Sequence, residues 1–154
     1  MNRKTILGIA VVAGLLGGIH AAAAQTSSTP ATCMYPWCWT HVQVVQGAGG
    51  APVAQLVWNE FRMAKKASGV TLGWLLVGSP DYELRPDSVV ITGVNAAGSS
   101  GQFPLRQSTA VQFPMDDLNT NDLTYTYEIR VYKKGAPPGT APVVANGTIV
   151  NAFN

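Results

Sequence analysis

The clearest pattern of hydrophobic and polar positions lies between residues 123 and 132. Apolar residues occupy every second position there: Leu123, Tyr125, Tyr127, Ile129 and Val131. Successive side chains of a β-strand point to opposite faces of its sheet. The alternation therefore predicts a strand with one buried face.

A hairpin is predicted between residues 61 and 76. Its apolar positions are Phe61 and Met63 on one arm and Val70, Leu72, Trp74 and Leu76 on the other. Ala67-Ser68-Gly69 supplies the turn, because glycine adopts positive φ without a steric cost. A helix competes for the first arm, where apolar residues are also spaced by three and four: Val53, Leu56, Val57, Phe61 and Ala64. We favour strands, because Gly69 and the β-rich run after it do not suit a helix.

Four further strands are predicted between segments rich in glycine and proline: 41–45, 87–94, 108–113 and 142–150. In the last of them, Asn146-Gly147 predicts either a tight hairpin turn or a bend in the terminal strand. About seven strands at this spacing indicate an all-β fold, an antiparallel sandwich of two sheets.

Two stretches carry a resemblance to a known fold family. "VTLGWLLV", residues 70–77, resembles the middle of an immunoglobulin-like or fibronectin type III sandwich, with Trp74 in the place of the core tryptophan. "NDLTYTYEIRV", residues 121–131, resembles the penultimate strand of that fold. The chain departs from the family because neither stretch has a cysteine and because Asn121 stands where antibody domains carry aspartate. The resemblance implies an immunoglobulin-like β-sandwich.

A second resemblance concerns the stretch "WLLVGSPDYELRPDSVVITG", residues 74–93. It is similar to small exported bacterial proteins of unknown function. This similarity implies export and the same fold, and it implies no activity.

The N-terminus has the layout of a secretory signal peptide. Arg3 and Lys4 precede the apolar run 6–19, and small residues follow up to Ala24. The run is shorter than the ~20 apolar residues that span a bilayer. We expect a signal peptide over 1–24, a flexible N-terminal segment over 25–34 and one folded domain over 35–154. The mature protein is then periplasmic or secreted, with no membrane insertion after signal cleavage.

Loss of this leader changes the charge balance. The chain has ten basic and eight acidic residues, and Arg3 and Lys4 leave with the leader, so eight of each remain. Nucleic acids and anionic membranes require a basic excess or patch. We therefore expect no nucleic-acid partner.

The only two cysteines lie in "TCMYPWCW", residues 32–39. Cys33 and Cys38 are expected to form a disulfide, because thiols oxidise in exported proteins. A copper centre is the alternative, in which His41 and Met34 would join the two thiolates. The C-x4-C spacing differs from the C-x-x-C of redox-active dithiols.

The aromatic residues of the same stretch alternate. Tyr35, Trp37 and Trp39 would share one face of an extended segment. Such a face either stacks against sugar rings or covers one end of the core, and we favour the core. If they are exposed, these residues are the predicted ligand or partner contacts.

The stretch "DDLNTND", residues 116–122, offers oxygen ligands. The candidate calcium ligands are Asp116, Asp117, Asn119, Asn121 and Asp122. Glu128 does not complete an EF-hand, because Asp122 takes the position of the required glycine and a strand follows. Asparagine and aspartate are also common turn residues, and we favour a plain turn.

Enzyme motifs are absent from the sequence, and His41 is the only histidine after the leader. A Ser-His-Asp relay would have to be built around it. We expect no catalytic activity and no cofactor. The predicted function is an exported binding or structural module that contacts another protein through loops or a strand edge. A metal-binding protein and a carbohydrate-binding module remain as alternatives.

Overall fold

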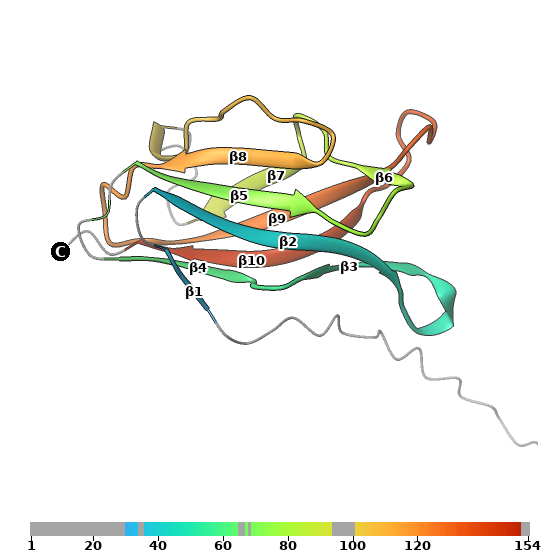
Figure 1. Cartoon of the computed structure of the whole chain (residues 1–154), viewed down its shortest axis with the longest axis horizontal. Helices are drawn as coiled ribbons and strands as arrows, with labels where there is room; N and C mark the ends of the chain where they lie inside the picture. The colour runs from blue at the N-terminus through green and yellow to red at the C-terminus, as the bar shows by residue number, and fades with distance from the viewer. Residues whose placement is uncertain (1–29, 34–35, 65–66, 68, 94–100, 152–154) are drawn as a thin grey trace, which may run out of the picture.

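The computed structural model describes residues 30–33, 36–64, 67, 69–93 and 101–151. The predicted signal peptide and Met34 and Tyr35 lie outside these residues. Two β-sheets make up most of the described chain (Figure 1). In this part of the chain, no helix has the length and apolar character needed to cross a membrane.

Sheet A has six strands. Their order is β1 (Ala31–Cys33), β4 (Glu60–Met63), β10 (Val143–Val150) and β9 (Thr124–Lys133), with β6 (Tyr82–Glu83) and β7 (Val89–Gly93) both along the other side of β9. Sheet B has the order β3 (Pro52–Leu56), β2 (Trp37–Gln46), β5 (Val70–Leu76) and β8 (Gln112–Asp117). A 3-10 turn, η1 (Ala48–Gly50), connects β2 to β3.

The predicted all-β sandwich is confirmed, with two corrections. The described chain has ten strands, not about seven. The sheets are mixed and not purely antiparallel, because the pairs β1–β4, β4–β10 and β2–β5 are parallel. The chain passes from sheet A to sheet B after β1 and returns after β3. Consecutive strands therefore often belong to different sheets, and neighbours within a sheet come from distant segments.

The strand predicted over 123–132 is confirmed as β9. Its buried face consists of Tyr125, Tyr127, Ile129 and Val131, while Thr124 and Thr126 are exposed. The core between the sheets is built around Trp74, whose ring meets Phe61 and Tyr127 edge to face at centroid distances of 5.3 and 5.1 Å. Burial raises the pKa of Tyr127.

The predicted hairpin over 61–76 is wrong, although both of its arms are strands. β4 pairs with β1 and β10 in sheet A, whereas β5 pairs with β2 and β8 in sheet B. The competing helix is also wrong, because 52–63 forms β3 and β4. Trp58 lies between β3 and β4. The buried hydroxyl of Thr40, on β2, accepts a hydrogen bond from Trp58 N (3.1 Å) and donates one to Trp58 O (2.9 Å). Thr40 thus anchors the point where the chain changes sheets.

Three other strand boundaries differ from the prediction. β8 begins at Gln112, so most of 108–113 is loop, and the Thr109 hydroxyl accepts a hydrogen bond from Gln112 N (3.1 Å) there. β2 is longer than 41–45. Ala31–Cys33, which we placed in the flexible segment, forms β1. These boundaries depend on pairing with distant strands, which periodicity does not report.

Asn146 and Gly147 lie inside β10, which runs unbroken through them, so the predicted turn is wrong. Gly147 is needed for a different reason. A Cβ at this position would overlap the Asn59 carbonyl and the Tyr127 hydroxyl. The glycine allows the close approach of a neighbouring strand and a core ring.

The outer edge of β8 is covered by the segment 102–106. Leu118 N donates to Gln102 O (3.1 Å), Asp116 N to Pro104 O (3.0 Å) and Arg106 N to Pro114 O (3.2 Å). Such cover protects a sheet from edge-to-edge association.

Candidate binding face

The predicted disulfide is confirmed: Cys33 and Cys38 are bonded, with a Cα–Cα distance of 5.2 Å. Cys33 lies on β1 of sheet A and Cys38 on β2 of sheet B. The bond therefore links the two sheets at the start of the domain. The sulfur atoms are not thiolates in this state, and His41, three residues after Cys38, lies on the opposite face of β2. The structure therefore does not bring Cys33, Cys38 and His41 together as metal ligands, and Met34 lies outside the described residues.

The candidate calcium ligands are also separated. Asp116 points outward from β8, whereas Asp117 is buried on the inner face, as expected for successive strand residues. Asn121 donates to the Tyr125 hydroxyl (2.8 Å) and accepts from Leu123 N (3.2 Å), which is turn chemistry. Among the described residues, no three His, Cys, Asp or Glu side chains gather in a group that could hold a metal ion.

The outer surface of sheet B collects a different set of residues. We define the tryptophan face as Trp37, Trp39, Thr71, Gly73, Asp116 and Arg106. The strand register aligns Trp37 with Thr71 and Asp116, and it aligns Trp39 with Gly73 and Pro114. β2, β5 and β8 lie side by side in Figure 1 and carry five of these residues.

Trp39 lies flat against the sheet, and Gly73 is the reason. A Cβ at position 73 would overlap three neighbouring atoms of the indole ring, Cδ2, Cε3 and Cζ3. The ring therefore packs on the glycine, and Trp39 is half-buried. Trp37, one pleat away on the same side of β2, is 66% exposed. Together they form an aromatic surface open to solvent. Tyr35, the third predicted member, lies outside the described residues.

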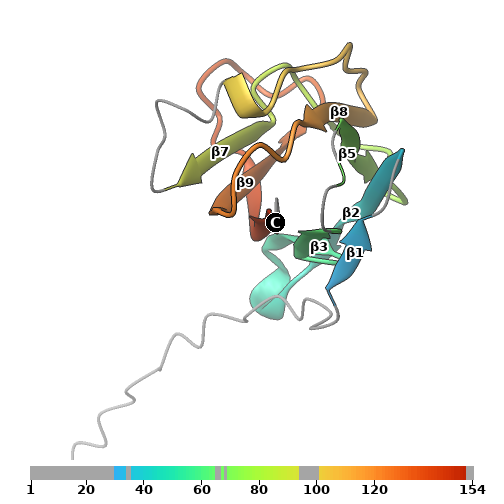
Figure 2. The same ribbon diagram turned by 90° about the vertical axis from the view of Figure 1, so that its left-hand side faces the viewer.

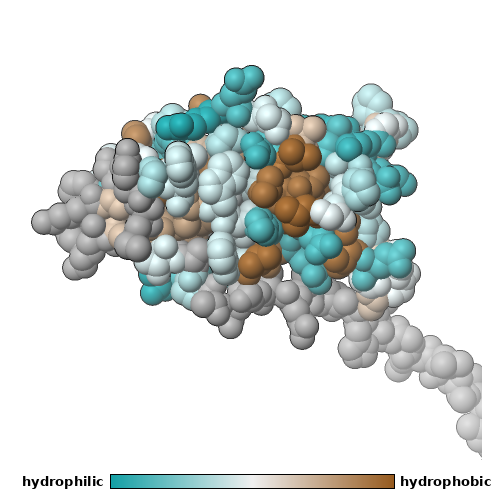
Figure 3. Space-filling view, in the orientation of Figure 1, coloured by the Kyte–Doolittle hydropathy of each residue, from teal (hydrophilic) through white to brown (hydrophobic). Residues whose placement is uncertain are grey.

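A polar row borders this aromatic surface. The Thr71 hydroxyl donates to Asp116 Oδ1 (2.9 Å), and Arg106 Nε donates to the same oxygen (2.7 Å). The side chains of Arg106 and Asp116 are 53% and 21% exposed, so water and a ligand can reach both. With strands about 4.8 Å apart, Asp116 lies about 10 Å across the sheet from Trp37. Figure 3, in the same orientation as Figure 1, shows an apolar patch bordered by hydrophilic residues over the C-terminal part of β5.

Sequence analysis found the two tryptophans and missed Thr71, Gly73 and Arg106. These three residues are far from residue 37 along the chain and reach it only through strand pairing. One signal was available, because a glycine inside the strand "VTLGWLL" often marks a close approach of another group.

His41 also lies exposed on β2, on the same face as Trp37 and Trp39. On the outer surface, His41 is aligned with Leu75 of β5, and Val57 N donates to the His41 carbonyl on the other side. The residues beside His41 on the two neighbouring strands, Leu75 and Val57, are therefore apolar. A histidine acting as a general base needs a nucleophile within hydrogen-bonding distance, usually with a carboxylate that orients the ring.

Comparison with known proteins leaves the function to be argued from this geometry. No protein-family model matches the chain, and no curated protein shows a significant match to it.

Proposed function

We propose that this protein is a non-enzymatic exported binding module and that its tryptophan face binds carbohydrate. The observation that carries the proposal is the flat ring of Trp39 on Gly73 beside the exposed Trp37. Aromatic rings present large apolar faces, and the C–H faces of sugar rings can stack on them. Export follows from the signal-peptide pattern of residues 1–24, and we infer an immunoglobulin-like type of sandwich from the family resemblance.

The polar row supports this choice of ligand. Sugar hydroxyls both donate and accept hydrogen bonds, and the row offers a carboxylate acceptor and a guanidinium donor. Asp116 and Arg106 already hold each other in place, so binding would order few additional side chains. A ligand that stacks on Trp37 and Trp39 could reach the row across β5.

The test is binding of purified protein to a glycan array, followed by calorimetric titration of the best ligand. We expect Trp37→Ala to weaken binding at least tenfold. Trp58→Ala is the matched control, because Trp58 is also partly exposed but lies at the chain crossing beside Thr40. The proposal fails if no glycan binds, or if both variants bind the glycan as the unmodified protein does.

A protein partner at the same face is the second candidate. It is favoured by Val57, which is exposed and continues the β2–β3 pairing past the end of β3, opposite His41 of β2. A photoreactive amino acid at position 37, compared with one at position 58, tests this candidate in native cells. Crosslinking of one defined protein from position 37 alone would support it, and equal labelling from both positions would count against it.

A further inference from the structure

The two long sides of the sandwich are closed differently. On one side, the chain passes between the sheets from β1 to β2 and from β3 to β4, and the Cys33–Cys38 disulfide joins them. On the other side, β7 is the edge of sheet A and the segment 102–106 is the edge of sheet B. β7 pairs with β9 and 102–106 with β8, and a backbone hydrogen bond from Leu84 N to Ala110 O (2.8 Å) joins the two sheets farther along this side, next to β6. Figure 2 shows β7 on the side opposite β1, β2 and β3.

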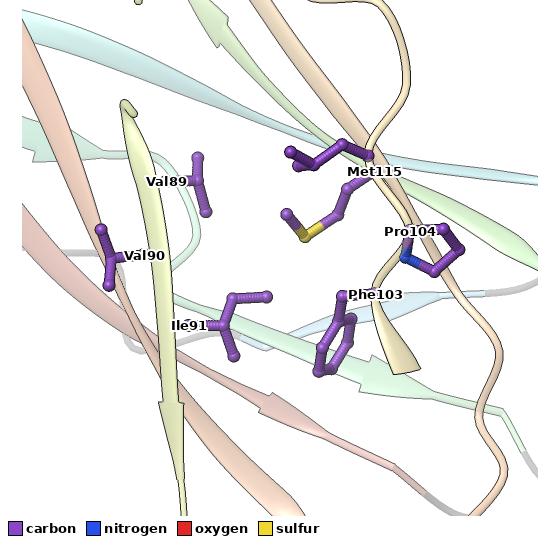
Figure 4. Close-up of a pocket in the computed structure, with 7 residues that line it drawn as sticks. Val89, Val90, Ile91, Phe103, Pro104 and Met115 are labelled. Carbon is purple, nitrogen blue, oxygen red and sulfur yellow. The ribbon is translucent and has the colours of Figure 1, made fainter. Parts of the chain in front are cut away.

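A cavity of about 500 Å³ lies between β7 and the segment 102–106. Its lining residues are Val89, Val90, Ile91, Phe103, Pro104, Leu105 and Met115. Figure 4 shows Val89 and Ile91 of β7 pointing toward Met115 and Phe103 across the cavity. The side chain of Val90 points the other way, so the β7 main chain forms the wall at that position.

The walls are held by packing within the fold. Phe103 meets Tyr125 edge to face at a centroid distance of 4.9 Å, and Phe103 and Met115 are almost fully buried. Leu105 is 64% exposed although it lines the cavity. It therefore places apolar surface at the mouth, where an entering apolar group would cover it.

The chemistry of the lining restricts the ligand. The side chains that face the cavity are apolar and the β7 main chain supplies few polar groups, so a charged or hydroxyl-rich molecule would lose most of its hydrogen-bond partners on burial there. The volume lies within the range of about 300–1,000 Å³ that is usual for small-molecule sites. Sugars, nucleotides and free amino acids do not suit this cavity, and a flexible hydrocarbon does.

We propose that the cavity between β7 and the segment 102–106 binds the hydrocarbon chain of a single-chain amphiphile such as a fatty acid. The chain enters past Leu105 to Met115, and the polar end stays in solvent at the mouth. This site lies between the sheets, not on the outer surface of sheet B, so it does not depend on the tryptophan face.

A chain-length series tests the proposal. Saturated fatty acids from eight to sixteen carbons, each below its micelle concentration, are titrated calorimetrically into the full mature protein. Because a buried methylene contributes ~0.8 kcal/mol, we expect affinity to rise roughly fourfold per added methylene over this series. Absence of binding would overturn the proposal. So would an affinity that does not change with chain length, since the hydrocarbon would then not be buried.

Paired variants on one strand locate the site. Ile91→Trp fills the cavity and should weaken binding at least tenfold, whereas Val90→Trp places the same ring on the other face of β7 and should leave binding unchanged. If circular dichroism shows that Ile91→Trp does not fold, Leu105→Asp replaces it, with the exposed Val144→Asp on β10 as its control. If the two variants of the tested pair bind the fatty acid with the same affinity, whether unchanged or reduced, the assignment of the site is overturned.

Discussion

At the residue scale, the fully buried carboxyl group of Asp117 is a titratable group inside the fold. Its Oδ1 accepts hydrogen bonds from Gln102 Nε2 (2.6 Å), Asn119 N (2.8 Å) and Asn151 Nδ2 (3.3 Å). Its Oδ2 and the Oδ1 of Asn151 have no hydrogen-bond partner among the described residues. Burial raises the pKa of Asp117, and the hydrogen bonds only partly oppose this effect. A proton on Asp117 removes the charge that burial disfavours.

This raised pKa predicts how stability depends on pH. The native state holds the Asp117 proton at pH values where the unfolded chain, with a pKa near 3.8, has lost it. The resulting stabilisation is complete below the unfolded value and is lost as pH rises through the native pKa. Asp117→Asn keeps an acceptor oxygen and removes the titration.

Urea denaturation of both proteins between pH 3 and pH 8 measures this effect. The free energy of unfolding of Asp117→Asn, relative to the unmodified protein, should increase as pH rises. Asp116→Asn, on the outer face beside Arg106, is the control and should not reproduce this trend. A difference that stays constant with pH would contradict the prediction.

A second prediction at this scale concerns Gly73. Gly73→Ala should destabilise the protein by about 1–3 kcal/mol, because its Cβ would displace the Trp39 ring. In a Trp39→Ala background the same change should cost little, since the ring is gone and glycine itself weakens a strand. Chemical denaturation of the four proteins of this double-mutant cycle gives the coupling. Additive effects would show that the ring does not rest on Gly73.

At the scale of elements, the crossing between β3 and β4 depends on one hydroxyl group. Thr40→Val keeps the shape of the side chain but removes the hydrogen bonds to both Trp58 N and Trp58 O. We expect a loss of about 1–3 kcal/mol, because buried polar groups lose their partner. Thr126→Val, at an exposed Thr92–Thr126 pair, is the control and should change stability by about 0.5 kcal/mol or less. Equal effects on the free energy of unfolding would contradict this role.

At the scale of the whole molecule, the Cys33–Cys38 bond joins the two sheets. Replacing both cysteines by alanine should lower the free energy of unfolding by about 2 kcal/mol, because the closed loop is short. Hydrogen exchange should accelerate most in β1, whose three residues pair only with β4. Uniform acceleration across both sheets would show instead that the bond stabilises the domain as a whole.

The tryptophan face and the cavity are also properties of the whole molecule. Trp37 and Trp39 were candidates from their alternation, and the fold supplied Gly73 beneath one ring and Asp116 two strands away. The cavity had no counterpart in the predictions, because β7 and the segment 102–106 meet only when the sheets pack. Two of the candidate calcium ligands, Asp116 and Asp117, are separated because neighbouring residues of a strand point to opposite faces of the sheet.

What the sequence by itself determined is local. The alternation in β9 predicted its buried face correctly, and two nearby cysteines in a chain expected to be exported predicted the disulfide. Both depend on neighbouring residues, whose geometry follows from the strand period and from the reach of two side chains.

Only the tertiary structure decided which strands pair, which sheet each joins and which polar groups become buried. β4 and β5 are adjacent in sequence, yet they belong to different sheets. Sheet pairing uses backbone hydrogen bonds that nearly every residue can make, so side-chain periodicity specifies a buried face but not a neighbour. The pairing of strands is decided by the packing of the whole core around Trp74, and this packing also forms the tryptophan face and the cavity.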